Sequence, residues 1–85
     1  MPSDNNFSSR LQFFLSLESS SRRREMAELI IGSLYEMETG IEDTRLRAMA
    51  LEILADDIRQ YSCVQSDKEK EMLRFEIILI ADMIA

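Results

Sequence analysis

The side chains in this sequence that could do chemistry are mostly carboxylates. Acidic residues lie close together at several places, such as Glu36/Glu38, Glu42/Asp43 and Asp56/Asp57. Clustered carboxylates can bind Mg²⁺ or Ca²⁺ through their oxygen atoms, but none of these groups has the spacing of an EF-hand loop. We therefore interpret the clusters as a solvated acidic surface and expect no metal site.

The chain contains no histidine, the residue that most often serves as a general base and as a transition-metal ligand. Its single cysteine, Cys63, cannot build a thiolate zinc site, and no glycine-rich loop is present to bind phosphate. We expect no catalytic residues and no cofactor. The prediction is that the protein is not an enzyme.

Three consecutive arginines, Arg22, Arg23 and Arg24, are the feature best suited to an outside partner. They follow three serines, any of which can cap the helix that comes next. Positive charge at a helix N-terminus opposes the helix dipole, which costs the helix at most about 1 kcal/mol of stability. A bound anion would relieve this unfavourable interaction. Two interpretations stay open, a solvated charge run and a binding site for a carboxylate or phosphate partner.

Length and charge limit the number of domains and the classes of partner that the chain can have. The 85 residues allow one domain, which we divide into a disordered lead-in over residues 1–6 and a single helical domain over residues 7–85. A net charge of −6 disfavours nucleic acid and anionic membranes as partners. One cysteine and no signal-peptide pattern favour a cytoplasmic protein.

The segments that contain these residues are predicted to be helices. Hydrophobic periodicity predicts a short helix near residues 7–17, followed by helices over residues 25–39, 44–61 and 67–83. We expect Gly32 to allow close helix contact and Gly40 to end the second helix in the left-handed conformation. Ser66 and Glu69 match a capping box at the start of the last helix.

Apolar stripes along the predicted helices indicate which residues form the core. In the first helix the stripe comprises Phe7, Leu11, Phe14 and Leu15, with Phe13 and Leu17 beside it; in the second it comprises Met26, Leu29, Ile30, Ser33, Leu34 and Met37. In the third it comprises Leu46, Met49, Ala50, Ile53, Leu54, Ile58 and Tyr61. We expect Glu52, Asp56 and Asp57 to face away from this core.

The last helix is apolar around most of its circumference and carries two stripes. Leu73, Ile77, Ile80 and Ile84 form the first, and Met72, Phe75, Leu79 and Met83 form the second. Two other helices and a short lid can cover one stripe, and monomers seldom leave the other in water. The expected fold is all-α, with three main helices and a short N-terminal helix, paired into a homodimer through Met72, Phe75, Leu79 and Met83.

The order of these segments resembles a known family. An aromatic pair at Phe13 and Phe14 precedes a polar spacer, the helical segment EMAELIIGSL (25–34), an aliphatic helix, an acidic break and a terminal aliphatic helix. This order is similar to that of the small enterobacterial YmgB/AriR family of biofilm and acid-resistance regulators, described as two-component-system connector proteins. The resemblance covers about residues 11–84. It implies an all-α homodimer that contacts regulatory or signalling proteins, and it brings no catalytic residues.

The favoured function is therefore a small acidic cytoplasmic regulator that acts by protein–protein interaction, with itself and with a regulatory or signalling protein. Two alternatives remain. One is a nucleoid-associated or DNA-binding regulator that uses Arg22–Arg24, although the acidic loop at Glu42 and Asp43 disfavours direct DNA contact. The other is an acidic mimic of nucleic acid that inhibits a partner protein.

Overall fold

The computed structural model describes residues 3–84, and the side chains of residues 7–84. It contains the helices α1 (Ser3–Ser16), α2 (Ser20–Leu34), α3 (Thr44–Cys63) and α4 (Asp67–Ile84). The expected all-α fold with four helices is confirmed. Of the lead-in expected over residues 1–6, residues 1 and 2 lie outside the described part, and α1 begins at Ser3.

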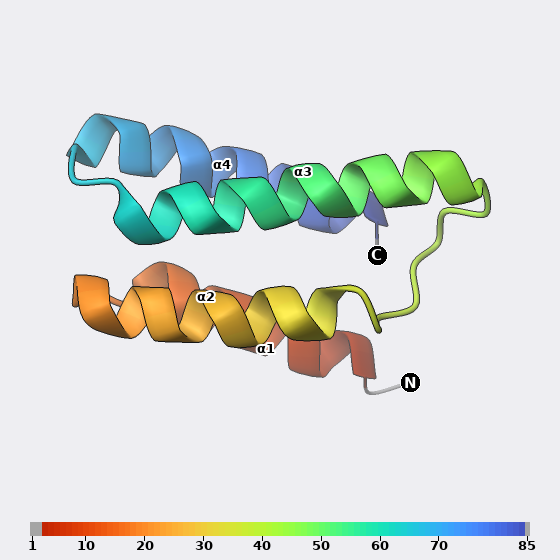
Figure 1. Ribbon diagram of the computed structural model, residues 1–85, viewed down its shortest axis with the longest axis horizontal. Helices are drawn as coiled ribbons and strands as arrows, with labels where there is room; N and C mark the ends of the chain where they lie inside the picture. Colours follow the sequence, from red (N-terminus) through yellow and green to blue (C-terminus); the bar gives the residue numbers. More distant parts are fainter. Residues whose placement is uncertain (1–2, 85) are drawn as a thin grey trace.

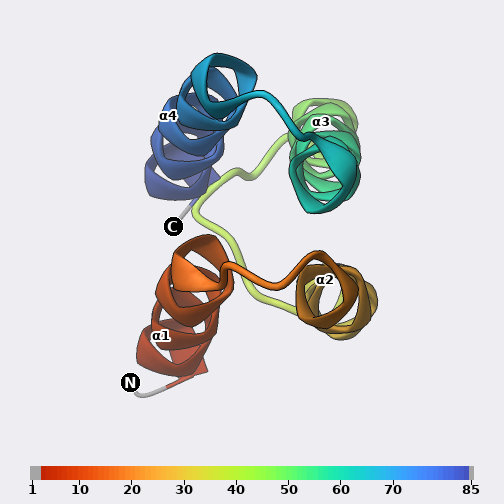
Figure 2. The ribbon, with the colours of Figure 1, turned by 90° about the vertical axis from the view of Figure 1, so that its left-hand side faces the viewer.

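The four helices form two antiparallel hairpins that stack on each other. Figure 1 shows α1 and α2 as the lower hairpin and α3 and α4 as the upper one. Seen from the end, α3 lies above α2 and α4 lies above α1 (Figure 2). α3 packs most extensively, against both α2 and α4. The turns within both hairpins lie at the same end of the bundle.

Side-chain caps set several helix starts. Asp43 accepts hydrogen bonds from the backbone N–H groups of Arg45 (2.8 Å) and Leu46 (3.2 Å) at the start of α3. At α4, Ser66 Oγ accepts from the N–H of Glu69 at 3.4 Å, which is one of the two bonds of the expected capping box. The sequence therefore predicted the starts of α3 and α4 within a residue.

The bounds of the second helix were predicted wrongly. α2 begins at Ser20, capped by the side chain of Ser19, and ends at Leu34 instead of residue 39. Gly40 does not take the left-handed conformation. Its N–H instead donates to the carbonyl oxygen of Ile84 at 2.9 Å, so this glycine connects the α2–α3 loop to the end of α4.

Gly32 was also interpreted wrongly. A Cβ atom built on Gly32 meets no atom within 4 Å, and the residue is exposed. Gly32 therefore permits no close helix contact. Ordering its flexible backbone still costs conformational entropy on folding, and no packing gain offsets that cost.

The core lies between the hairpins and draws on all four helices. Its largest fully buried side chains are Phe14, Ile30, Leu34, Leu54, Ile58, Tyr61, Ile77 and Ile84. The rings of Phe14 and Tyr61 lie 5.3 Å apart and are tilted by 56°. The Tyr61 hydroxyl donates to the carbonyl oxygen of Leu15 at 2.7 Å and so joins α3 to α1. In α1 the predicted stripe holds: Leu11, Phe14 and Leu15 are buried, while Phe7 is half-buried.

Candidate protein-interaction surface

The second stripe of α4 lies on the outside of the bundle. Met72, Phe75, Leu79 and Met83 have exposed fractions of 65%, 70%, 50% and 70%. The first stripe faces inward, with Ile77 and Ile84 buried and Leu73 and Ile80 half-buried. The two stripes therefore separate into a core side and an open side, as an apolar helix must if it has neighbours on one side only.

α3 adds to this open side, against the sequence-based expectation. Leu46, Met49 and Ile53 were assigned to the core and are exposed instead. The core side of α3 is carried by Leu51, Leu54, Ala55, Ile58 and Tyr61. The reason is that α3 is apolar over more than half of its circumference, so periodicity alone did not fix which part turns inward.

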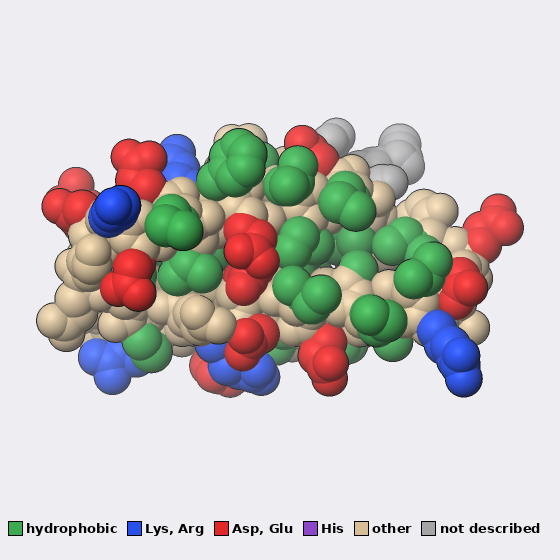
Figure 3. Space-filling view, turned by 90° about the horizontal axis from the view of Figure 1, so that it is seen from above, with side chains coloured by type: hydrophobic (Ala, Val, Ile, Leu, Met, Phe, Trp, Pro, Cys, Tyr) green, Lys and Arg blue, Asp and Glu red, His purple; other side chains and the backbone are tan. Residues whose placement is uncertain are grey.

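We call the combined surface the α3/α4 apolar face. It consists of Leu46, Met49, Ile53, Met72, Phe75, Leu79 and Met83. Figure 3 looks down on it and shows hydrophobic side chains gathered over both upper helices, with acidic side chains between and around them. A groove of about 750 Å³ runs along it. Its lining comprises Ile53 from α3 and Glu71, Met72, Phe75, Glu76, Leu79 and Ile80 from α4.

Asp57 lies next to this groove and is not the outward-facing residue that the sequence predicted. Only 6% of it is exposed, and its Oδ2 has no hydrogen-bond partner among the described residues. Burial raises the pKa of the Asp57 carboxyl to about 7, helped by a hydrogen bond to Glu76 that only the protonated acid can donate and by the negative charges of Glu76 and Asp56. Asp57 on α3 and Glu76 on α4 thus form a carboxyl pair between the two helices.

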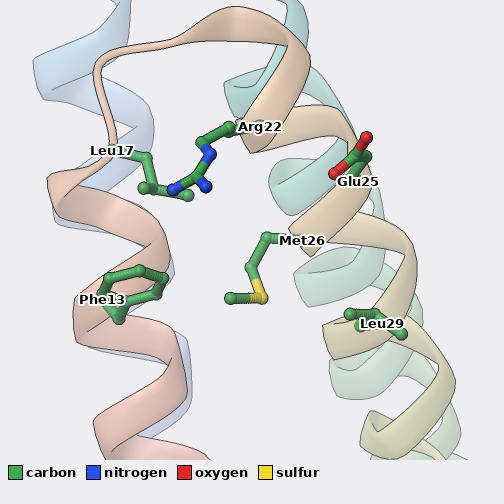
Figure 4. Close-up of a pocket in the computed structure, with 6 residues that line it drawn as sticks. All are labelled: Phe13, Leu17, Arg22, Glu25, Met26 and Leu29. Atoms are coloured by element: carbon green, nitrogen blue, oxygen red, sulfur yellow. The ribbon is translucent and has the colours of Figure 1, made fainter.

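The three arginines of the predicted partner site do not lie together: Arg22 lines one groove, whereas Arg23 and Arg24 lie at the turn end of the bundle. Arg22 lines a groove of about 230 Å³ between α1 and α2, together with Phe13, Leu17, Glu25, Met26 and Leu29. Figure 4 shows Arg22 reaching from α2 toward Leu17 on the opposite side of this groove. Arg23 is buried, and Arg24 is exposed at the end of the bundle. The run is therefore not a single basic patch, which removes the geometric basis for using all three residues on one DNA backbone.

The remaining candidate chemistry is sparse. Cys63 is a free, exposed thiol at the end of α3. Among the described side chains, those of residues 7–84, no three acidic, cysteine or histidine groups come close enough to hold a metal ion. No helix among these residues is long and apolar enough to cross a bilayer.

Comparison with protein-family models, with curated proteins and with solved structures gave no match to this chain.

Proposed function

We propose that this protein is a small regulatory module that acts by protein–protein contact, and that it pairs with a second copy of itself through the α3/α4 apolar face. The observation that carries the proposal is the exposure of seven large apolar side chains on two adjacent helices. Monomeric proteins rarely expose contiguous apolar patches beyond a few hundred Å², and larger patches mark interaction sites.

The size of the face supports a second copy as its occupant. Side chains of this kind, each about half exposed, together offer on the order of 500 Å² of apolar surface. A standard interface buries about 800 Å² on each partner, and about 65% of that is apolar in homodimers, which corresponds to a similar apolar area. One further copy is therefore enough to cover the face.

The shape of the face supports the same occupant. The upper hairpin is a pair of antiparallel helices with its apolar side outward (Figures 1 and 3). Two such pairs related by a two-fold axis would complete a four-helix arrangement, a common way to bury apolar helix faces. If each side chain contributes about 1 kcal/mol on burial, fourteen of them give a gross gain of roughly 14 kcal/mol, at or above most estimates of the cost of association.

The regulatory part of the proposal follows from the residue types. The described surface offers apolar and charged side chains for binding, and the sequence holds no histidine and one cysteine. We propose a cytoplasmic regulator that binds proteins and does not catalyse a reaction, of the kind that the YmgB/AriR resemblance implies for biofilm formation, acid resistance and two-component signalling.

Sedimentation equilibrium at micromolar concentration tests the homodimer. We expect a dimer for the unmodified chain and a folded monomer for Phe75→Glu, because Phe75 lies outside the core and a buried carboxylate would disrupt the interface. Leu29→Glu is the matched control, since Leu29 is also 70% exposed but lies on α2. This variant should remain dimeric. A folded monomer for the unmodified chain, or loss of the dimer only in Leu29→Glu, would overturn the proposal.

A further inference from the structure

A polar pocket at the turn end of the bundle offers a second binding site. It has a volume of about 490 Å³ and lies between the α1–α2 turn and the α3–α4 turn, which Figure 2 shows facing the viewer. We call it the end pocket. Its cationic lining comprises Arg23, Arg24 and Lys70, and the hydroxyls of Ser20 and Ser62 also border it. No residue of the α3/α4 apolar face lines it.

Arg23 brings a buried charge to this pocket. Only 5% of the residue is exposed, and its Nη1 donates to the carbonyl oxygens of Leu17 at 3.1 Å and Glu18 at 3.0 Å. The guanidinium carbon lies 5.9 Å from the ring centre of Tyr61, and Nε has no partner among the described residues. Carbonyl oxygens and a ring stabilise the cation without neutralising it, and a guanidinium does not lose its proton. An anion in the pocket would add a countercharge close to this guanidinium.

The N-termini of two helices at the end pocket also favour the binding of an anion. α2 begins at Ser20 and α4 begins at Asp67, and both residues line the end pocket. A helix N-terminus carries a partial positive charge and free backbone N–H groups, which bind phosphate in many proteins. Two N-termini and a buried guanidinium therefore act on the same space.

We propose that the end pocket binds the phosphate group of a small phosphomonoester. The lining carries three cations against the carboxylates of Glu18 and Asp67, which leaves one net positive charge in addition to the helix N-termini. This balance suits one phosphate group, and the net charge of −6 on the chain repels a long polyanion such as nucleic acid. The pocket falls within the usual size range of small-molecule sites, so it has room for the group that the phosphate esterifies.

Titration of the ¹⁵N-labelled protein, followed by NMR, tests this proposal independently of the homodimer. Sodium phosphate and glycerol phosphate are the two probes, and sodium chloride at equal ionic strength is the blank. We expect saturable shifts of the backbone amides in residues 20–24 and 67–70, with tighter binding of the ester. Equal binding of both probes would overturn the ester assignment and leave free phosphate as the ligand. Shifts that chloride reproduces, or that do not saturate, would overturn the site.

Neighbouring arginines provide the matched variants. Arg24→Ala and Lys70→Ala should each weaken binding of the ester by about fivefold to tenfold, the effect of one lost charge-assisted contact. Arg22→Ala should leave it within about twofold, because Arg22 lines the α1/α2 groove instead of the end pocket. These three side chains lie outside the buried core, so the variants should fold. Equal losses in Arg22→Ala and Arg24→Ala would show a diffuse charge effect and overturn the proposal.

Discussion

Asp57 makes the stability of this protein depend on pH in an uncommon direction. Its pKa is raised from 3.8 in the unfolded chain to about 7 in the fold. Between these two pH values the native state holds a proton that the unfolded state releases. The free energy of unfolding should therefore fall as pH rises through this window, by at most about 1.4 kcal/mol per pH unit. Above pH 7 the stability that comes from the bound proton of Asp57 is fully lost.

Urea unfolding at pH 5, 6, 7 and 8 measures this effect. Asp57→Asn should remove the slope that Asp57 contributes and should be more stable than the unmodified protein at pH 8, because the amide carries no charge to bury. Glu52→Gln, an exposed neutralisation on the same helix, should keep the slope of the unmodified protein. Parallel pH profiles for the unmodified protein and Asp57→Asn would contradict the prediction.

The burial of Asp57 and Arg23 could not be predicted from the sequence. A period of 3.6 residues locates an apolar side of a helix, but a polar residue at the edge of that side can turn either way. Asp57 points toward Glu76 on α4, and Arg23 is buried where two carbonyl oxygens of the α1–α2 turn accept its hydrogen bonds. The first placement depends on a contact between two helices, and the second depends on the course of the α1–α2 turn; helical periodicity encodes neither.

At the scale of the helices, local hydrogen-bonding chemistry predicted more than periodicity did. Ser66 was recognised as a cap because a side-chain oxygen just before an apolar helix satisfies free N–H groups. The end of α2 was missed because Gly40 seemed to be its C-terminal signal, whereas the backbone leaves the helix after Leu34. Glycine allows a left-handed residue but does not require one.

Gly32 gives a prediction at this scale. Because a Cβ atom on Gly32 meets nothing within 4 Å, Gly32→Ala should stabilise the protein by about 0.5–1 kcal/mol, through the lower backbone entropy of the unfolded chain. Thermal and urea unfolding measure the change. A less stable Gly32→Ala protein would mean that this side of α2 is covered.

At the scale of the whole molecule, the fold class followed from the sequence but the orientation of the helices did not. The four apolar segments and their short connections predicted four helices, and the exposed second stripe of α4 fits the predicted surplus of apolar surface. That α3 would add Leu46, Met49 and Ile53 to this surface was missed, since the rotation of α3 is set by α2 and α4 together.

One hydrogen bond connects the two hairpins across the core and gives a further prediction. Burial raises the pKa of the Tyr61 phenol, which keeps its hydroxyl protonated as the donor to Leu15. Tyr61→Phe leaves that buried carbonyl oxygen without its donor and should cost about 1–3 kcal/mol. Hydrogen exchange should quicken mainly in α1, because this bond holds α1 against α3.

The exposed tyrosine supplies the control for this variant. Tyr35→Phe changes a side chain that is about half in water, so exchange and stability should stay as they are in the unmodified protein. Equal behaviour of the two variants would show that the bond between Tyr61 and Leu15 does not hold α1 in place.

The order of helix packing has a consequence for how the chain folds during its synthesis. Helices adjacent in sequence make the main contacts, from α1–α2 through α2–α3 to α3–α4, and such local topology favours folding in microseconds to milliseconds. Yet α2 packs more extensively against α3 than against α1, and the ring of Phe14 in α1 lies 5.3 Å from the ring of Tyr61 in α3. The first hairpin therefore cannot complete its core while α3 is still inside the ribosome. The nascent chain must carry Phe14, Ile30 and Leu34 uncovered until residue 61 has emerged, and it folds when α3 arrives.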